Sequence, residues 1–412
     1  MKESIKDRNI LILNHYATRP NDPGGSRHYA LARGLIKDGW KVTICASTFD
    51  HFLKKQRFKD VGLYHNEEIN KVSYQWIKTI GYKNNSIFRI MGMLQFSIQS
   101  FLRNFNKKKF NYDFIIGSSV HPFTVFSAFL LSKRHGVNFA FEIRDLWPET
   151  LIQIGSLSSN SFVCNFLFKL EKFLSEKAAL IIGVLPNIDE YLIEKSIDFK
   201  KFVWIPNGVM LDYFPLNPYP YNNKKFTVTY FGSVGNANGL DTIVDSMQYL
   251  KAQDLCSEIC LRIIGSGPLL SKIKKQASEL ISNEIIVFDE PVPKNLISET
   301  CRDTNAFILH FLDRPILYKY GVSPNKIFDY MACCRPIIIA ASIPNNYVLD
   351  ANCGVVCKPE DPKKIAEVIY KLSKEPSNDL EDMSLRGRKF VGAHFSMDVL
   401  AKKLGKSIER LI

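Results

Sequence analysis

The sequence lacks several features that would assign it to a class at once. Residues 1–9 are polar and charged, and no apolar stretch as long as the h-region of a signal peptide follows them, so a secretory signal is not expected. No run of about 18 apolar residues occurs, so a membrane-spanning helix is not expected either. The 9 cysteines form no CxxC pair, and no histidine cluster completes Cys256/Cys260 or Cys353/Cys357 as a metal site. These absences predict a cytoplasmic protein with reduced thiols and no bound metal.

Acidic residues are scarce in one half of the chain. Over its 412 residues the chain has 54 Lys and Arg against 41 Asp and Glu. Residues 1–210 hold 29 of the basic and 18 of the acidic residues, whereas the remainder is nearly balanced at 25 and 23. A positive field confined to the first half favours an anionic partner there, such as a membrane surface, a phosphorylated lipid or nucleic acid.

Strand and helix patterns alternate along the chain, and the alternation is interrupted once. The interruption at 208–225 contains Pro215, Pro218 and Pro220 and is typical of a linker. We therefore expect an α/β protein with two doubly wound Rossmann-like domains, in which ligands bind beyond the carboxyl ends of the strands and in the cleft between domains. The expected parts are a first domain 1–210, a linker 211–225, a second domain 226–390 and a terminal helix 391–412, which could pack back on the first domain.

Two glycine-containing turns lie between a predicted strand and a predicted helix. They are Pro23-Gly24-Gly25-Ser26 and Gly265-Ser266-Gly267-Pro268. Glycine lets a backbone approach a ligand closely, and a helix N-terminus offers free N–H groups to an anion. The alternative is an ordinary turn before a capped helix. Neither segment is the GxGxxG of dinucleotide-binding proteins, which disfavours a nicotinamide-dependent dehydrogenase.

Two further segments follow strands of the first domain. The segment 142–149 has a density of charge, at Arg144, Asp145 and Glu149, that a buried turn would not tolerate. It predicts either a cleft segment that touches substrate or a structural Arg–Asp pair. His121-Pro122 follows another strand, where a histidine serves catalysis or structure equally well.

The constellation at 323–331 is the most specific. Ser323 is expected to cap a helix that has Pro324 at its first position and Asn325 next to it. Lys326 then lies in the first turn, where a cation opposes the helix dipole unless an anion binds there. Asp329 follows on about the same face and could accept from ribose hydroxyls, or simply pair with Lys326.

One amphipathic helix is expected over 87–105. Its apolar stripe is followed at once by Lys107, Lys108 and Lys109. The stripe either packs inside the domain or lies on an anionic membrane with the lysines at the headgroups. The residues of the stripe are Ile87, Met91, Leu94, Ile98, Phe101 and Phe105.

At these residues the chain resembles the GT-B glycosyltransferases, and specifically glycosyltransferase family 4. The matching segments come in family order and span nearly the whole chain: PGGS at 23–26, RDLWPE at 144–149, PNGV at 206–209, GSGP at 265–268, and SPNK with DYMA at 323–332. The resemblance implies a GT-B fold, with two Rossmann-like domains facing across a cleft. It also implies metal-independent transfer of a sugar, with retained anomeric configuration, from a nucleotide diphosphate donor.

RDLWPE and SPNK resemble the subgroup that builds bacterial O-antigen, capsule or exopolysaccharide. That resemblance implies a UDP-sugar donor, often an N-acetylaminosugar, and a lipid-diphosphate-linked or saccharide acceptor. It further implies a protein attached peripherally to the inner face of the cell membrane. No cofactor and no nucleic acid partner is expected.

The resemblance also implies roles for individual residues. His121 matches the position near the anomeric centre, and His121 and Lys326 are the expected catalytic residues. Asp329 replaces the second of two family acids, whereas the first is Gly321, and the family Arg and Lys are replaced by Ser233 and Asn238. Lys326 is therefore expected to neutralise the diphosphate. The expected donor-binding residues are Gly24, Gly25, Gly265, Gly267, Ser323, Asn325, Lys326 and Asp329, and the expected acceptor or cleft residues are Arg144, Asp145 and Glu149.

Two other functions remain open from the sequence. A GT-B nucleotide-sugar 2-epimerase would need the paired acids, which Gly321 disfavours. A non-catalytic nucleotide- or anion-binding partner would explain the basic charge, but no nucleic-acid recognition motif accompanies it.

Overall fold

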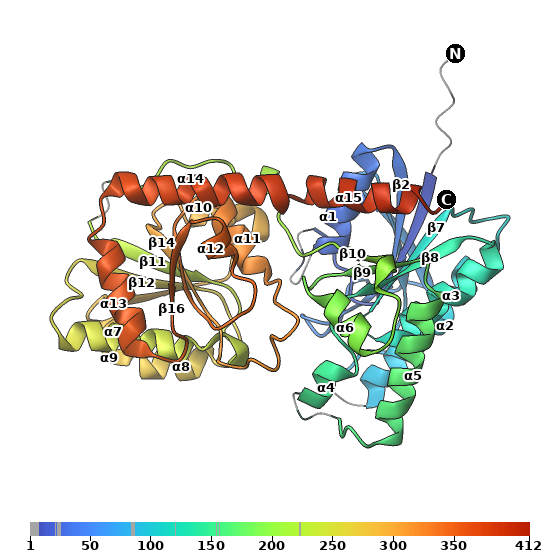
Figure 1. The fold of residues 1–412 in the computed structure, drawn as a ribbon, viewed down its shortest axis with the longest axis horizontal. Helices are drawn as coiled ribbons and strands as arrows, with labels where there is room; N and C mark the ends of the chain where they lie inside the picture. The colour runs from blue at the N-terminus through green and yellow to red at the C-terminus, as the bar shows by residue number, and fades with distance from the viewer. Residues whose placement is uncertain are drawn as a thin grey trace, which may run out of the picture. The chain divides into compact units, whose positions relative to one another are not determined.

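The chain folds into two compact units, Met1–Pro206 with Met397–Ile412, and Asn207–Ser396 (Figure 1). The two helices at the end of the chain belong to different units, because α14 (Ser377–His394) ends before Ser396 and α15 (Met397–Glu409) packs against α1 (Arg27–Lys37) of the first unit. The terminal segment expected at 391–412 thus holds the end of α14 and the whole of α15. The computed structural model describes residues 8–20, 22, 26–83, 87–119, 121–153, 155, 157–221 and 224–412.

The described part of the first unit contains an 8-stranded sheet, in the order β10-β9-β8-β7-β1-β2-β6-β5. Its paired strands are parallel except for β5, which runs antiparallel to β6. The strands are β1 (Arg8–Leu13), β2 (Trp40–Ser47), β5 (Tyr64–Ile69), β6 (Val72–Ile77), β7 (Phe114–Ser118), β8 (Asn138–Ile143), β9 (Leu180–Gly183) and β10 (Phe202–Trp204). The sequence analysis missed the β5–β6 hairpin, because polar residues alternate through it. The strands β3 (Phe49–Asp50) and β4 (Lys55–Gln56) form a separate two-stranded antiparallel sheet.

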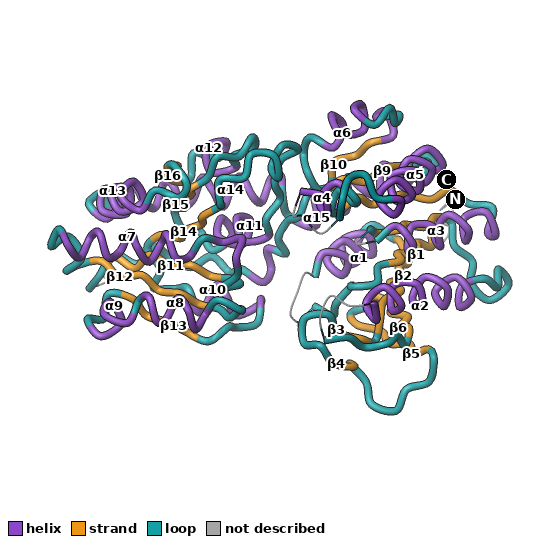
Figure 2. Tube along the Cα trace, turned by 90° about the horizontal axis from the view of Figure 1, so that it is seen from below, coloured by secondary structure: helices purple, strands orange, loops and turns teal. Residues whose placement is uncertain are grey.

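Helices connect these strands, with α2, α3 and α5 packed side by side in one layer (Figure 2). α3 has Pro122 at its first position and ends at Gly136, whose left-handed backbone (φ 69) suits a residue without a Cβ. No helix within the described ranges is both long and apolar enough to cross a membrane. The connecting helices are α2 (Ile87–Asn104), α3 (Pro122–His135), α4 (Glu149–Gln153), α5 (Phe162–Lys177) and α6 (Ile188–Glu194).

The second unit is a parallel sheet in the order β13-β12-β11-β14-β15-β16. Its strands are β11 (Phe226–Phe231), β12 (Ile259–Ile264), β13 (Ile286–Asp289), β14 (Ala306–His310), β15 (Ile337–Ala340) and β16 (Gly354–Cys357), of which β16 was not predicted from the sequence. Its other helices are α7 (Leu240–Ala252), α8 (Leu270–Gln276), α9 (Ser278–Ser282), α10 (Ile297–Thr300), α11 (Asn325–Ala332), α12 (Tyr347–Asp350) and α13 (Pro362–Ser373).

Each sheet has one switch point, where the strand order reverses. In the first unit it lies between β1 and β7, and in the second between β11 and β14. The loops that leave the carboxyl ends of these strand pairs diverge to opposite faces, which leaves room for a ligand. These two strand edges are where candidate functional residues are sought.

The expected linker is fastened to the second unit by one buried arginine. The Arg335 side chain, only 1% exposed, donates to the carbonyl oxygens of Pro218 at 3.0 Å and Thr304 at 2.6 Å. A buried guanidinium needs several acceptors, and the irregular linker supplies backbone carbonyls that no strand has used. The segment expected to be a linker thus belongs to the second unit.

Candidate functional site

Two histidines meet at the switch point of the first unit. His15 follows β1 and His121 precedes α3, and their Nδ1 and Nε2 atoms lie 3.0 Å apart. The His15 ring is stacked between Tyr16 and Phe96, with ring centroids at 4.4 and 4.7 Å. The stack fixes the plane of His15, so the hydrogen bond in turn orients the imidazole of His121. The sequence analysis found His121 but missed His15, whose pairing joins residues far apart in the chain.

Both imidazoles are uncharged at neutral pH. Burial and the nearby Arg89 lower the pKa of His121 to about 3. Burial, His121 and His51 lower the pKa of His15 well below its ordinary value. One ring therefore donates the shared hydrogen bond and the other accepts it. A neutral imidazole at a strand edge can form a hydrogen bond with a ligand, but the lowered pKa values make both rings poor proton acceptors at neutral pH.

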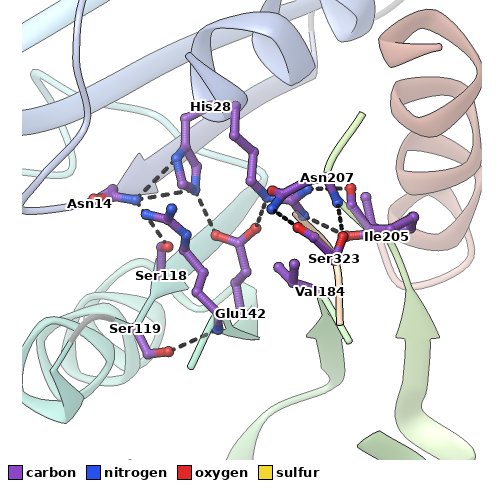
Figure 3. A network of polar contacts seen from close by, with 12 residues as sticks. Asn14, His28, Ser118, Ser119, Glu142, Val184, Ile205, Asn207 and Ser323 are labelled. Carbon is purple, nitrogen blue, oxygen red and sulfur yellow. Dashed lines mark hydrogen bonds and ion pairs between the residues drawn. The ribbon is translucent and has the colours of Figure 1, made fainter. Parts of the chain in front are cut away.

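A buried network of polar groups around Glu142 joins α1 to β8 (Figure 3). The Arg27 guanidinium donates to Glu142 Oε1 at 2.9 Å and to the carbonyl of Ile205 at 2.7 Å. His28 Nε2 lies 2.6 Å from the second oxygen of Glu142. Burial alone would raise the pKa of Glu142, but His28 and Arg27 together hold it well below its usual range. The pair ties α1 to β8 at the edge of the sheet.

The same network continues to the ends of β1 and β7. Asn14 lies 3.0 Å from His28 Nδ1 and donates to Ser118 Oγ at 3.1 Å (Figure 3). Four strand or helix ends are thus joined by buried polar groups. These residues were not singled out from the sequence, although a charged pair at 27–28 within an apolar helix pattern was a usable signal.

The three expected acceptor residues follow β8 and lie in different environments. The Arg144 backbone N–H donates to Ser119 Oγ at 3.1 Å. Asp145 is exposed, whereas Glu149 opens α4 and its carboxylate lies 3.3 Å from Lys195 Nζ. The Arg–Asp pair considered as an alternative is not among the ion pairs of the described residues. The acceptor role of the three side chains stays a prediction.

Lys326 reaches the switch point of the second unit. Its ammonium donates to Tyr230 Oη at 2.7 Å and to Asn238 Oδ1 at 2.5 Å. Tyr230 and Asn238 in turn donate to the carbonyl of Ser233 at 2.7 and 2.9 Å. The resemblance expects Arg and Lys at positions 233 and 238. Instead, Asn238 accepts a hydrogen bond from Lys326 of α11, and the Ser233 carbonyl binds the two residues that hold the lysine. Burial lowers the pKa of Lys326 to about 8.

The glycines near Lys326 are required by close packing. A Cβ at Gly232 would lie 2.2 Å from Lys326 Cε, and one at Gly265 would lie 1.9 Å from the carbonyl oxygen of Gly232. A Cβ at Gly267 would lie 2.3 Å from the Val234 carbonyl oxygen. Gly265 and Gly267 therefore let two neighbouring loops touch, which explains them without a ligand. Their expected donor-binding role stays a prediction.

Ser323 does not cap α11 as expected. The helix begins at Asn325, which is exposed, and Pro324 holds the capping position without a side-chain hydrogen bond. Ser323 Oγ instead accepts from the Asn207 backbone N–H at 2.9 Å, and the Asn207 side chain donates to the Ser323 carbonyl at 2.6 Å (Figure 3). The Ser323 hydroxyl does not cap α11 because it already accepts a hydrogen bond from Asn207, a residue far away in the sequence. Local sequence rules could not predict this contact.

Asp329 does not pair with Lys326. Its buried carboxylate lies 3.0 Å from Lys294 Nζ, and burial raises its pKa although Lys294 opposes this. The two side chains lie on one helix face, but Lys326 binds Tyr230 and Asn238 whereas Asp329 pairs with Lys294. Gly321 has a left-handed backbone (φ 89), which explains why no acid stands at the family position. The ribose-binding role of Asp329 stays a prediction.

The remaining expectations concern the donor-binding glycines of the first domain and the absence of a metal site. Gly24 and Gly25 lie outside the described residues. Within the described ranges, no group of three or more His, Cys, Asp and Glu is placed to hold a metal ion.

These features define a class of protein. Two Rossmann-like units, each with polar side chains at its switch point, are the GT-B architecture of glycosyltransferases. Family profiles agree: "Glycosyltransferase Family 4" matches residues 24–213 and "Glycosyl transferases group 1" matches residues 217–390. The chain belongs to glycosyltransferase family 4.

Individual relatives are distant. The probable glycosyltransferase WbjE of Pseudomonas aeruginosa is 24% identical over 272 residues, which is 63% of this chain and 66% of WbjE. A sucrose-phosphate synthase structure from Thermosynechococcus elongatus has a TM-score of 0.72 at 18% identity, covering 98% of this chain and 99% of that one. HepE of Anabaena, in complex with UDP and glucose, has a TM-score of 0.66 at 11% identity, covering 98% and 99%. The match spans just under two thirds of WbjE, and the structures share the fold.

Proposed function

We propose that the protein is a retaining glycosyltransferase that takes a sugar from a UDP-sugar, an N-acetylaminosugar in the first instance. The acceptor is a lipid-diphosphate-linked or saccharide hydroxyl in bacterial surface polysaccharide synthesis, which brings the protein to the inner face of the cell membrane. Support for a nucleotide-sugar donor comes from the family and from HepE, a protein of the same fold whose structure contains UDP and glucose.

The observation that carries the proposal is the ammonium of Lys326 at the carboxyl end of β11. Two of its three protons are donated to Tyr230 and Asn238, so one is left for an anionic oxygen. Burial has lowered the pKa of this lysine, and a diphosphate would restore the full charge. Among the described residues Lys326 forms no ion pair, and a cation held at a switch point by neutral partners is well suited to bind an anion.

In the proposed reaction the bond between the anomeric carbon and the diphosphate breaks, and a bond from that carbon to the acceptor oxygen forms on the same face. The electron pair of the broken bond stays on the diphosphate, where Lys326 stabilises it without a metal ion. The acceptor hydroxyl gives its proton to the departing diphosphate oxygen. The neutral His121, oriented by His15, holds the sugar near the reacting carbon.

Calorimetric titration with UDP, GDP and NAD in EDTA tests the donor site. We expect micromolar binding of UDP that weakens in Lys326→Met and is unchanged in Lys371→Met, which replaces an exposed lysine of the same unit. Preference for GDP would replace the proposed donor. Binding of NAD alone, or of none of the three, would overturn the proposed function.

A further inference from the structure

Large apolar side chains are exposed on the outward side of the layer formed by α2, α3 and α5. On α2 the usual arrangement is reversed, because small and polar residues are buried and apolar residues face outward. The side of α2 that faces the sheet includes Gly92, Ser97 and Ser100 together with Phe96. Its exposed side is apolar along the length of the helix. That side consists of Ile87, Ile90, Met91, Leu94, Ile98 and Leu102, each at least 41% exposed. Every residue of the predicted stripe except the half-buried Phe101 is exposed, so the alternative in which the stripe packs inside the domain is wrong.

The neighbouring helices extend this apolar face. On α5, Phe162 is 85% exposed, and Phe166 and Phe173 are also exposed. On α3, which packs against both α2 and α5, Phe126 is exposed and Phe129 contacts the Phe173 ring at 5.3 Å. We call the exposed apolar side chains of these three helices the apolar layer face. A continuous face of this kind on a water-soluble protein marks an interaction site.

The charge around α2 and α3, two of the three helices of the apolar layer face, is almost entirely of one sign, whereas α5 carries three lysines together with Glu171 and Glu176. From residue 69 to residue 141 the sequence has 10 Lys and Arg, and Asp113 is its sole acidic residue. Helices α2 and α3 contain no Asp or Glu. The exposed lysines 107–109 follow α2, and Lys133 and Arg134 end α3. A second copy of the chain would place these cations against one another, so self-association on this face is disfavoured.

The apolar layer face also reaches the edge of the sheet that holds the candidate site. α2 and α5 begin at the carboxyl edge, because each leads directly from its C-terminus to the amino end of the next strand. Arg89, in the first turn of α2, lies 5.9 Å from the ring of Tyr16, which stacks on His15. The exposed Ile87 and Phe162 at the helix starts therefore lie on the side of the sheet where the histidines meet.

We propose that the apolar layer face inserts into the headgroup region of an anionic lipid bilayer. Apolar side chains enter the acyl boundary, and the lysines at the helix ends contact anionic headgroups. The face turns the histidine edge of the sheet towards lipid-linked molecules. This inference rests on the proposed function for its biological sense, but the binding itself needs neither donor nor acceptor.

Flotation of the full-length protein with vesicles tests the proposal. One set of vesicles is phosphatidylcholine, and the other contains about a third phosphatidylglycerol, an estimate of a typical anionic surface. We expect binding to the anionic set, and a loss of roughly 30-fold or more in the partition coefficient for Phe162→Ser/Phe166→Ser and for Ile98→Ser/Leu102→Ser. Leu349→Ser, at a position 60% exposed in the second unit, is the matched control and is expected to bind normally.

Three results would overturn the proposal. They are no binding of the wild-type chain to anionic vesicles, unchanged binding of both serine pairs, and a dimer in sedimentation that the serine pairs dissociate. Binding lost only in Lys108→Glu/Lys109→Glu would indicate adsorption by charge alone, which also contradicts insertion. Unfolding temperatures and UDP titration of the same variants separate this failure from failure of the proposed donor site, because none of the changed residues lies near Lys326 in the chain.

Discussion

Replacement of Lys326 by methionine should make the second unit more stable and the protein less able to bind UDP. Burial lowers the pKa of this lysine from 10.5 to about 8. At about 1.4 kcal/mol for each pKa unit, keeping the ammonium charged at pH 7 costs on the order of 3 kcal/mol. Methionine removes this cost but loses two hydrogen bonds of about 1 kcal/mol each. We expect a net gain of roughly 1 kcal/mol in the free energy of unfolding at pH 7.

The dependence on pH has a defined sign. Between pH 8 and 10.5 the unfolded chain keeps a proton on Lys326 that the folded chain has released. The stability of the wild type should therefore rise with pH through this window and be lower below it, whereas Lys326→Met should lack the rise. Urea unfolding at pH 7 and pH 9.5 measures the difference. Equal pH dependence in the two proteins would refute the burial argument.

The effect on UDP runs the other way. Loss of a charge-assisted hydrogen bond of about 1.5–3 kcal/mol should weaken UDP binding by roughly 10- to 150-fold. In the wild type, the affinity should fall as the pH rises above 8, by up to about tenfold per unit, because the ammonium loses its proton. Lys326→Met should show no such fall. A wild-type affinity that is flat from pH 7 to 9.5 would contradict the assignment of Lys326 to the diphosphate.

A paired substitution sharpens the test. Asn238 Oδ1 lies 2.5 Å from the Lys326 ammonium, so a lysine at 238 can bring a cation to the same point from the opposite side. Asn238→Lys/Lys326→Met should recover much of the UDP affinity that Lys326→Met loses. Asn238→Lys alone should destabilise the unit, since two ammonium groups would share one pocket. If the double variant bound UDP as weakly as Lys326→Met, a cation at this position would not determine UDP affinity.

Three further outcomes follow from the buried groups. The pKa of His121 is about 3 when folded, so the free energy of unfolding should fall as the pH drops from 6.5 towards 3, and His121→Phe should lower that slope by about one proton in urea unfolding. Arg27→Met should cost roughly 3–5 kcal/mol of stability, because it removes the permanently charged partner of the buried Glu142 carboxylate and leaves it only His28; a cost under about 1 kcal/mol would contradict this. Gly265→Ala should abolish UDP binding with little change at the first unit, since its Cβ would meet the Gly232 carbonyl at 1.9 Å, and normal UDP titration would show that the loops are free to separate.

Local pattern was sufficient for much of this protein. Strands and helices of an α/β chain have distinct periodicities, and the order of the motifs along the chain is enough to place each candidate residue near a strand end. His121, Lys326 and the 265–268 turn were found in this way. The apolar stripe of 87–105 was also plain in the sequence, because helical spacing is a local property.

The tertiary structure decided what those residues touch. Lys326 binds Asn238 rather than Asp329, Ser323 binds Asn207 rather than its own helix, and His15 joins His121 across 106 positions. It also decided that the apolar stripe of α2 faces outward while its serines face the sheet. Contacts between distant segments depend on how whole strands and helices pack, and periodicity along the chain reports that one face is apolar without reporting what covers it.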